Sequence, residues 1–195
     1  MAVPRLSITH AELMALPILR YHGPIHVVKT AAELRAVRHE RVVGLDTETR
    51  PTFRKGQSHP PSLVQIATAR AVYLIQLATV DCAHALAEIF GDAHIVKAGV
   101  ALGRDLKELG RLFSHEPAGV VELDAVAKRR GYPQTGVRNL AGILLGGRIT
   151  KGARTSNWAA PRLTESQLRY AATDAWVCRE LYFRFEKLGL LSEPA

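Results

Sequence analysis

The sequence predicts a single α/β domain over residues 25–195, preceded by a peripheral segment over residues 1–24. Two observations predict this fold class. Short runs rich in β-branched residues alternate with longer segments that carry an apolar stripe, and two runs, residues 63–68 and 71–77, have the tight connection of a hairpin. A length of 195 residues fits one domain. The hydrophobic content of 47% and the mean hydropathy of zero are typical of a soluble globular protein.

The element boundaries follow from cap and turn signals. Thr9 is expected to cap a short helix that Pro17 ends, and two capping-box patterns, Thr30–Glu33 and Thr164–Gln167, open later helices. The second of them begins the longest predicted helix. In chain order, we expect strands at residues 25–28, 41–49, 63–68, 71–77, 94–99 and 120–123, and helices at residues 10–16, 31–40, 81–90, 103–113, 124–130, 137–145 and 165–188.

The chain is organised around the strand predicted over residues 41–49, which begins with buried β-branched residues and ends with Asp46 and Glu48. Side chains two positions apart on a strand share a face, so both acids point to the same side at a strand end, where α/β sheets bind ligands. Such like charges repel unless a cation lies between them, and carboxylate oxygens suit Mg²⁺ or Mn²⁺. On this stretch alone, two solvated acids explain the pattern equally well.

The longest predicted helix carries an aspartate on its apolar side. Its inward stripe contains Tyr170, Asp174, Val177 and Cys178 at spacings of three and four residues. Burying an unpaired carboxylate is costly, so Asp174 needs a cation or a partner. Two interpretations stay open, a metal ion and an ion pair with a buried arginine. A further acid, Asp105, lies near the start of an earlier helix, beside its apolar stripe.

Two basic loops accompany these acids. The first follows Glu48 and contains Arg50, Arg54 and Lys55; the second, residues 146–158, contains Lys151, Arg154 and Trp158. With a net charge of +8, these loops favour a polyanionic partner, nucleic acid before a membrane surface. For the first loop, a solvated loop is the alternative. For Trp158, packing in the core and stacking on a nucleobase both stay open.

The cysteines and the N-terminus bear on location. Cys82 and Cys178 form no disulfide framework and no metal-ligand spacing, so we expect two reduced core thiols in a cytoplasmic protein. The N-terminus lacks the apolar run of a signal peptide, and no stretch approaches the ~20 apolar residues of a membrane span. We therefore expect no membrane partner.

The ordered set of motifs resembles the DEDDy 3′–5′ exonucleases. Asp46-x-Glu48, Asp105 and Tyr170-x-x-x-Asp174 match the family pattern over residues 25–190, and Ser156-Asn157-Trp158 looks most like the Werner-type branch. Arg169 stands where the histidine branch carries its histidine. The resemblance implies a ribonuclease H-like fold, with a mixed sheet flanked by helices.

The resemblance also implies a catalytic apparatus. Asp46, Glu48, Asp105 and Asp174 would hold two divalent cations, Mg²⁺ or Mn²⁺, and Tyr170 would orient the attacking water. Substrate contacts are expected from Thr47, Arg50, Arg54, Lys55, Lys151, Arg154 and Trp158. The implied reaction releases 5′-mononucleotides from a nucleic acid 3′ end, with single-stranded or recessed DNA favoured. An exoribonuclease acting on structured or very short RNA and a catalytically silent nucleic-acid-binding module are the alternatives.

Overall fold

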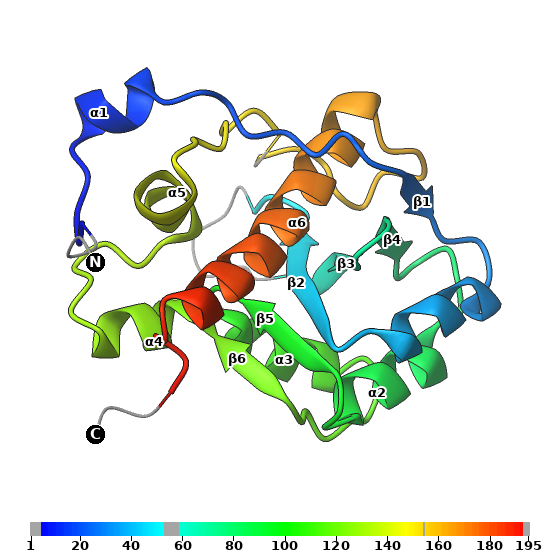
Figure 1. The fold of residues 1–195 in the computed structure, drawn as a ribbon. Coiled ribbons are helices and arrows are strands. Elements are labelled where there is room, and N and C mark those ends of the chain that lie inside the picture. The colour runs from blue at the N-terminus through cyan, green and yellow to red at the C-terminus, as the bar shows by residue number, and fades with distance from the viewer. Residues whose placement is uncertain (1–4, 53–58, 154, 193–195) are drawn as a thin grey trace.

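The computed structural model describes residues 5–52, 59–153 and 155–192, and a six-stranded sheet forms its centre (Figure 1). The strands are β1 (Ile25–Val27), β2 (Val42–Thr49), β3 (Pro61–Ala67), β4 (Val72–Gln76), β5 (Val96–Gly99) and β6 (Val120–Glu122). Their order is β1-β4-β3-β2-β5-β6. β3 runs antiparallel to β2 and β4, and the other neighbouring pairs are parallel. The predicted mixed sheet with an antiparallel hairpin is thus confirmed.

Helices cover both faces of this sheet. The longest helix, α6 (Glu165–Lys187), crosses one face diagonally over β2, as Figure 1 shows. The same side holds α4 (Leu123–Arg129), α5 (Val137–Leu140) and the π-helical turn η2 (Ala141–Leu145). The opposite face is covered by the 3₁₀ helix η1 (Ala31–His39), α2 (Ala83–Gly91) and α3 (Leu102–Gly110). These layers match the predicted arrangement of a sheet flanked by helices.

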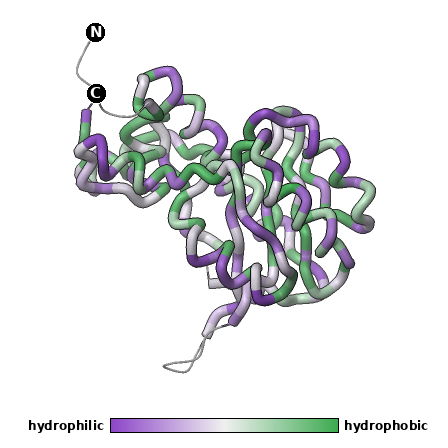
Figure 2. The backbone as a smooth tube through the Cα atoms, turned by 90° about the horizontal axis from the view of Figure 1, so that it is seen from below, coloured by the Kyte–Doolittle hydropathy of each residue, from purple (hydrophilic) through white to green (hydrophobic). Residues whose placement is uncertain are grey.

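Strand alternation divides the core into two sides. In β2, Val42 packs on the α6 side, whereas Val43 and Leu45 pack on the side of η1, α2 and α3. The same alternation places Asp46 on the α6 side and Thr47 on the α3 side. Figure 2 shows hydrophobic and hydrophilic residues alternating along much of the backbone, as expected of elements with one buried side. The register of β2 therefore decides which face of the sheet receives the acids.

Two predicted helices differ in type from an ordinary α-helix. The segment 31–39 is a 3₁₀ helix, in which the Glu33 amide donates to the Thr30 carbonyl oxygen at 3.2 Å. The segment 137–145 begins as an α-helix and continues as a π-helical turn, which ends at Gly146 with a φ of 67°. Apolar periodicity predicts that a helix exists, but it does not distinguish these backbone patterns.

The segment before β1 packs on the α6 side of the molecule. Its helix α1 (His10–Ala15) has the predicted Thr9 cap, reinforced by Glu12, and buries Leu13. The Leu19 amide donates to the Arg148 carbonyl oxygen at 2.9 Å, and the Tyr21 amide donates to Thr173 Oγ1 at 3.1 Å. The segment thus ties the second basic loop to α6.

Two further observations concern the cysteines and the helices. Cys82 and Cys178 are both buried and free, which confirms the predicted core thiols. Among the described residues, no helix is at once long enough and apolar enough to cross a membrane.

Candidate metal centre

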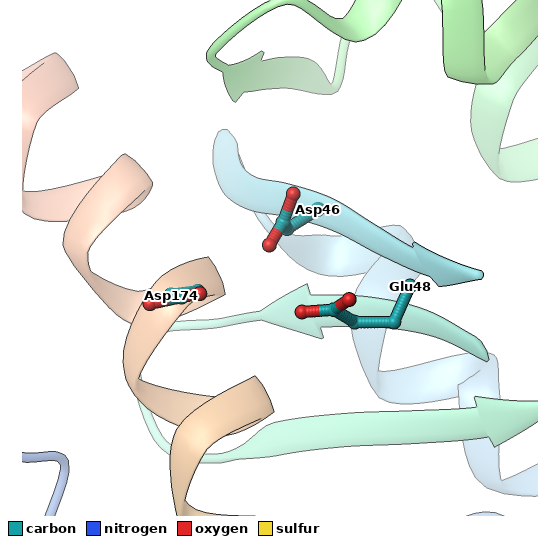
Figure 3. A group of neighbouring side chains, drawn as sticks. All are labelled: Asp46, Glu48 and Asp174. Carbon is teal, nitrogen blue, oxygen red and sulfur yellow. The ribbon is translucent and has the colours of Figure 1, made fainter. Parts of the chain in front are cut away.

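Asp46, Glu48 and Asp174 converge between β2 and α6 (Figure 3). Each offers a carboxylate oxygen, and these oxygens lie within 4.8 Å of one another. Asp46 and Glu48 come from the end of β2 and share a face, as predicted, and Asp174 comes from the α6 turn packed against that strand. Hard divalent cations bind such sets of oxygen atoms, so the residues present fit a metal ion.

Asp105 reaches the same region from the other side of the sheet. It lies in the first turn of α3, whose N-cap residue Ala101 has a left-handed backbone with a φ of 58°. The Leu102 amide at that helix start donates to Glu122 Oε2 at 2.9 Å. A hydrogen bond from the Thr47 side chain to Asp105 links α3 to β2. Asp105 therefore stands beside the group of three acids and outside its 4.8 Å limit.

Crowding and burial disfavour the charged forms of these acids. Burial raises the pKa of Asp46 well above its usual value, and the charges of Asp174 and Asp105 raise it further. Burial also raises the pKa of Asp174 to about 7, although a hydrogen bond from Tyr170 and the positive charge of Arg138 oppose the shift. Burial raises the pKa of Asp105 as well. Without a cation, the site therefore retains protons that isolated carboxyl groups would have lost.

The surroundings of Asp174 bear on its two interpretations, a metal ion and an ion pair. The residue is 7% exposed, and its Oδ1 atom has no hydrogen-bond partner among the described residues. Over the same residues, no arginine or lysine lies within salt-bridge distance of it, although the charge of Arg138 still acts on its pKa. A buried carboxylate oxygen without a partner, next to two other acids, favours the metal interpretation over the ion pair.

Tyr170 lies one helical turn before Asp174, and its hydroxyl donates a hydrogen bond to the Asp174 carboxylate. Burial and the neighbouring acids raise the pKa of this phenol, so it stays neutral and acts as a donor. Trp158 packs against Tyr170, with 6.0 Å between the ring centroids. Trp158 is fully buried in the core, so the predicted stacking of Trp158 on a nucleobase is wrong, and its alternative role in packing is confirmed.

Two cavities border the acids. One, of about 640 Å³, is lined by Glu48 and Asp105 together with Arg50 and Arg104. Of the predicted substrate contacts in this region, Arg50 thus lies beside the acids, and Thr47 has its side chain turned toward Asp105. Arg104 was not among the predicted contacts, although it directly precedes Asp105.

The second cavity, of about 430 Å³, is lined by Asp174 and Tyr170 together with Lys151 and Arg138. The exposed Lys151 is a predicted contact residue, whereas Arg138 at the start of α5 carried no recognisable signal. The remaining predicted contacts, Arg54, Lys55 and Arg154, lie outside the described residues. Positive side chains therefore flank the acids on two sides, an arrangement suited to a phosphate chain.

The sequence of the chain is similar to those of known 3′–5′ exonucleases. A family described as 3′–5′ exonuclease matches residues 25–189, which is most of the chain. Ribonuclease D of Gluconacetobacter diazotrophicus is 32% identical over 192 residues, covering 87% of this chain and 48% of the relative. The human exonuclease mut-7 homolog is 28% identical over 215 residues, covering 92% of this chain and 24% of the relative. The chain thus spans half or less of the length of these relatives.

Solved structures show the same fold. The Nibbler EXO domain of Aedes aegypti superposes with a TM-score of 0.77 at 24% identity, over 87% of this chain and 91% of that one. RNase D of Escherichia coli, an exoribonuclease involved in structured RNA processing, superposes with a TM-score of 0.73 at 25% identity, over 88% of this chain and 47% of that one. The ribonuclease H-like fold is thereby confirmed, and the chain belongs to the family of 3′–5′ exonucleases.

Proposed function

We propose that the protein hydrolyses nucleic acid from its 3′ end, one 5′-mononucleotide at a time, with divalent cations held by Asp46, Glu48, Asp105 and Asp174. The observation that carries the proposal is the set of carboxylate oxygens from Asp46, Glu48 and Asp174, which lie within 4.8 Å of one another on two packed elements. Membership of the exonuclease family supports it. A module that only bound nucleic acid would gain nothing from clustered acids, which repel phosphate.

The acids divide between two cation positions. Asp46 is central, because it lies close to Glu48 and Asp174 on one side and its pKa responds to Asp105 on the other. Glu48 and Asp174 would complete one position, and Asp105 would serve the second, with Mg²⁺ or Mn²⁺ as the ion. When bound, two such cations acidify water and neutralise charge on the leaving oxygen.

The chain's other residues position the reactants. The neutral Tyr170 hydroxyl, held over Asp174, is placed to hydrogen-bond and orient the attacking water. Lys151 and Arg138 border the acids on one side, and Arg50 and Arg104 border them on the other, so both cavities can neutralise phosphates next to the scissile bond.

Single-stranded or recessed DNA is the substrate that the resemblance to the Werner-type branch favours. An RNA 3′ end is the second candidate, because the chain is 32% identical to a ribonuclease D. The two differ by the 2′-hydroxyl, which a protein must contact or exclude to tell them apart.

A panel of 5′-labelled substrates tests the proposal. Single-stranded DNA, recessed duplex DNA, single-stranded RNA, hairpin RNA and dinucleotides are incubated with Mg²⁺, Mn²⁺ or EDTA, and the products are separated by length. We expect a ladder that shortens from the 3′ end and disappears in EDTA, and the fastest substrate identifies the preferred class. Cleavage from the 5′ end, or no cleavage of any substrate with either ion, contradicts the proposal.

A further inference from the structure

Gln65 is a fully buried polar residue in the middle of β3 that lacks hydrogen-bond partners. Its exposed fraction is 0%, and neither its Oε1 nor its Nε2 atom has a partner among the described residues. Leaving a buried amide unpaired is costly, so a buried group without a partner calls for an explanation such as an ordered water or an ion. Gln76 on the neighbouring strand shows the usual arrangement, since its Nε2 donates to the Ala160 carbonyl oxygen at 2.8 Å.

The sheet places Gln65 beside the acid cluster. Gln65 is the direct cross-strand partner of Asp46 in the antiparallel pair of β2 and β3. Residues in such positions project from the same face, with Cβ atoms about 4.5–5.5 Å apart. Leu63 and Ala67, which share the face of Gln65 on β3, pack against residues of α6. The Gln65 side chain therefore lies in the layer between sheet and α6 that also holds Asp174.

The acids offer the hydrogen-bond acceptors that Gln65 lacks. Asp46 lies opposite it, and Asp174 has a buried oxygen without a partner. A primary amide donates two hydrogen bonds and carries no charge, so it supports a carboxylate without competing with a cation for it. An arginine or lysine at this position would instead neutralise the acids.

We propose that Gln65 is a positioning residue of the metal centre: its Nε2 donates to the Asp46 carboxylate, directly or through one ordered water, and holds that carboxylate in its ligand orientation. This inference rests on the proposed function, because it takes the acid cluster to bind divalent cations. Hydrogen-bond partners of metal ligands typically change metal affinity about 10–100-fold when they are removed.

The competing explanation is that Gln65 only fills the core. In that case, Gln65→Met, which keeps the length of the side chain and removes its polar atoms, leaves metal binding as it was. Calorimetric titration with Mn²⁺ in the absence of nucleic acid separates the two. We expect Gln65→Met to raise the Mn²⁺ Kd about 10–100-fold. The matched control is Gln76→Met, which removes a buried glutamine on β4 from the same face of the sheet as Gln65. Its Mn²⁺ Kd should stay within twofold of that of the unaltered protein.

A crystal structure of the unaltered protein with Mn²⁺ gives an independent answer, including the case in which Gln65→Met does not fold. We expect the Gln65 Nε2 atom within hydrogen-bond distance of an Asp46 oxygen, or of one water that bridges them. If the ion is bound while the Gln65 amide pairs elsewhere or remains unpaired, or if Gln65→Met binds Mn²⁺ normally, the inference about Gln65 is wrong. An unaltered protein that binds no Mn²⁺ would instead overturn the proposed function on which the inference rests.

Discussion

Gly44 of β2 lies directly beneath the backbone of Ala175 in α6. A Cβ atom at Gly44 would stand 2.0 Å from the Ala175 carbonyl oxygen and 2.7 Å from the Arg179 amide nitrogen. This approach brings α6 so close to β2 that Asp174, one residue before Ala175, meets Asp46, two residues after Gly44. Because Gly44 has no side chain, β2 and α6 can approach closely enough for their acids to form one cluster.

Gly44→Ala should destabilise the protein by about 2–3 kcal/mol or more, because the methyl group collides with helix backbone that cannot rotate away. Denaturant unfolding of the metal-free protein measures the loss. Gly152→Ala is the control, since a Cβ there meets nothing within 4 Å. Equal stability of the two variants would mean that α6 adjusts its distance from β2 at little cost.

The stability of the metal-free protein should depend on pH because of the acids. Asp174 has a pKa of about 7 in the native state against 3.8 for the isolated group, so the native protein binds more protons than the unfolded chain between these values. The free energy of unfolding therefore falls as pH rises from about 4 through 7, and this contribution is constant above that range. We expect a higher melting temperature at pH 6 than at pH 8 in EDTA.

Asp174→Asn tests the source of this dependence, because it removes one crowded charge and keeps the shape. It should melt higher than the unaltered protein at pH 8 in EDTA and show a weaker pH dependence. The Mn²⁺-induced rise in melting temperature, on the order of 5–10 °C at a hundred times the Kd, should shrink. Asp81→Asn, an exposed acid outside the cluster, is the control. A lower melting temperature for Asp174→Asn in EDTA would point to a stabilising ion pair at Asp174.

Tyr170→Phe should slow hydrolysis by roughly 10²–10⁴, the usual contribution of a positioned acid–base group. Because the phenol donates to the ligand Asp174, the Mn²⁺ Kd should also rise, by about 10–100-fold, so the rates are compared at saturating Mn²⁺. Single-turnover kinetics and Mn²⁺ titration measure the two effects separately. An unchanged rate would reduce Tyr170 to a packing partner of Trp158.

Lys151→Ala should weaken substrate binding and lower the slope of log Kd against log salt by about one, the effect of losing one phosphate contact. Lys151 lines the same cavity as Asp174, so its ammonium group is near the expected substrate. Lys187→Ala is the matched control, because its position thirteen residues after Asp174 on α6 lies about 20 Å away along the helix. Equal salt slopes for both variants would place the phosphate chain elsewhere.

The acids could be predicted from the sequence because their signals are local. A spacing of two on a strand brings Asp46 and Glu48 to one face, and an aspartate on an apolar helix stripe marks Asp174. Capping boxes likewise predicted the starts of η1 and α6. Each of these patterns is complete within a few residues.

The remaining features depend on contacts between distant segments. Nothing near Gly44 in the sequence indicates that α6 packs on it, and Gln65 looks like an ordinary residue of an apolar strand until its register with Asp46 is known. Arg138 reaches the site only because α5 packs beside α6. Trp158 stands in a glycine-rich basic loop, yet its ring inserts into the core, so a residue's loop position did not predict its burial.

In the proposed function, Asp46 holds the ions with which the protein removes nucleotides from a 3′ end. Digestion of the preferred 5′-labelled substrate at saturating Mn²⁺ by the unaltered protein and by Asp46→Ala tests it most directly, with circular dichroism to show that the variant is folded. We expect a 3′-to-5′ ladder from the unaltered protein and none from folded Asp46→Ala. If Asp46→Ala retains more than a small fraction of the rate, the acid cluster is not the catalytic centre.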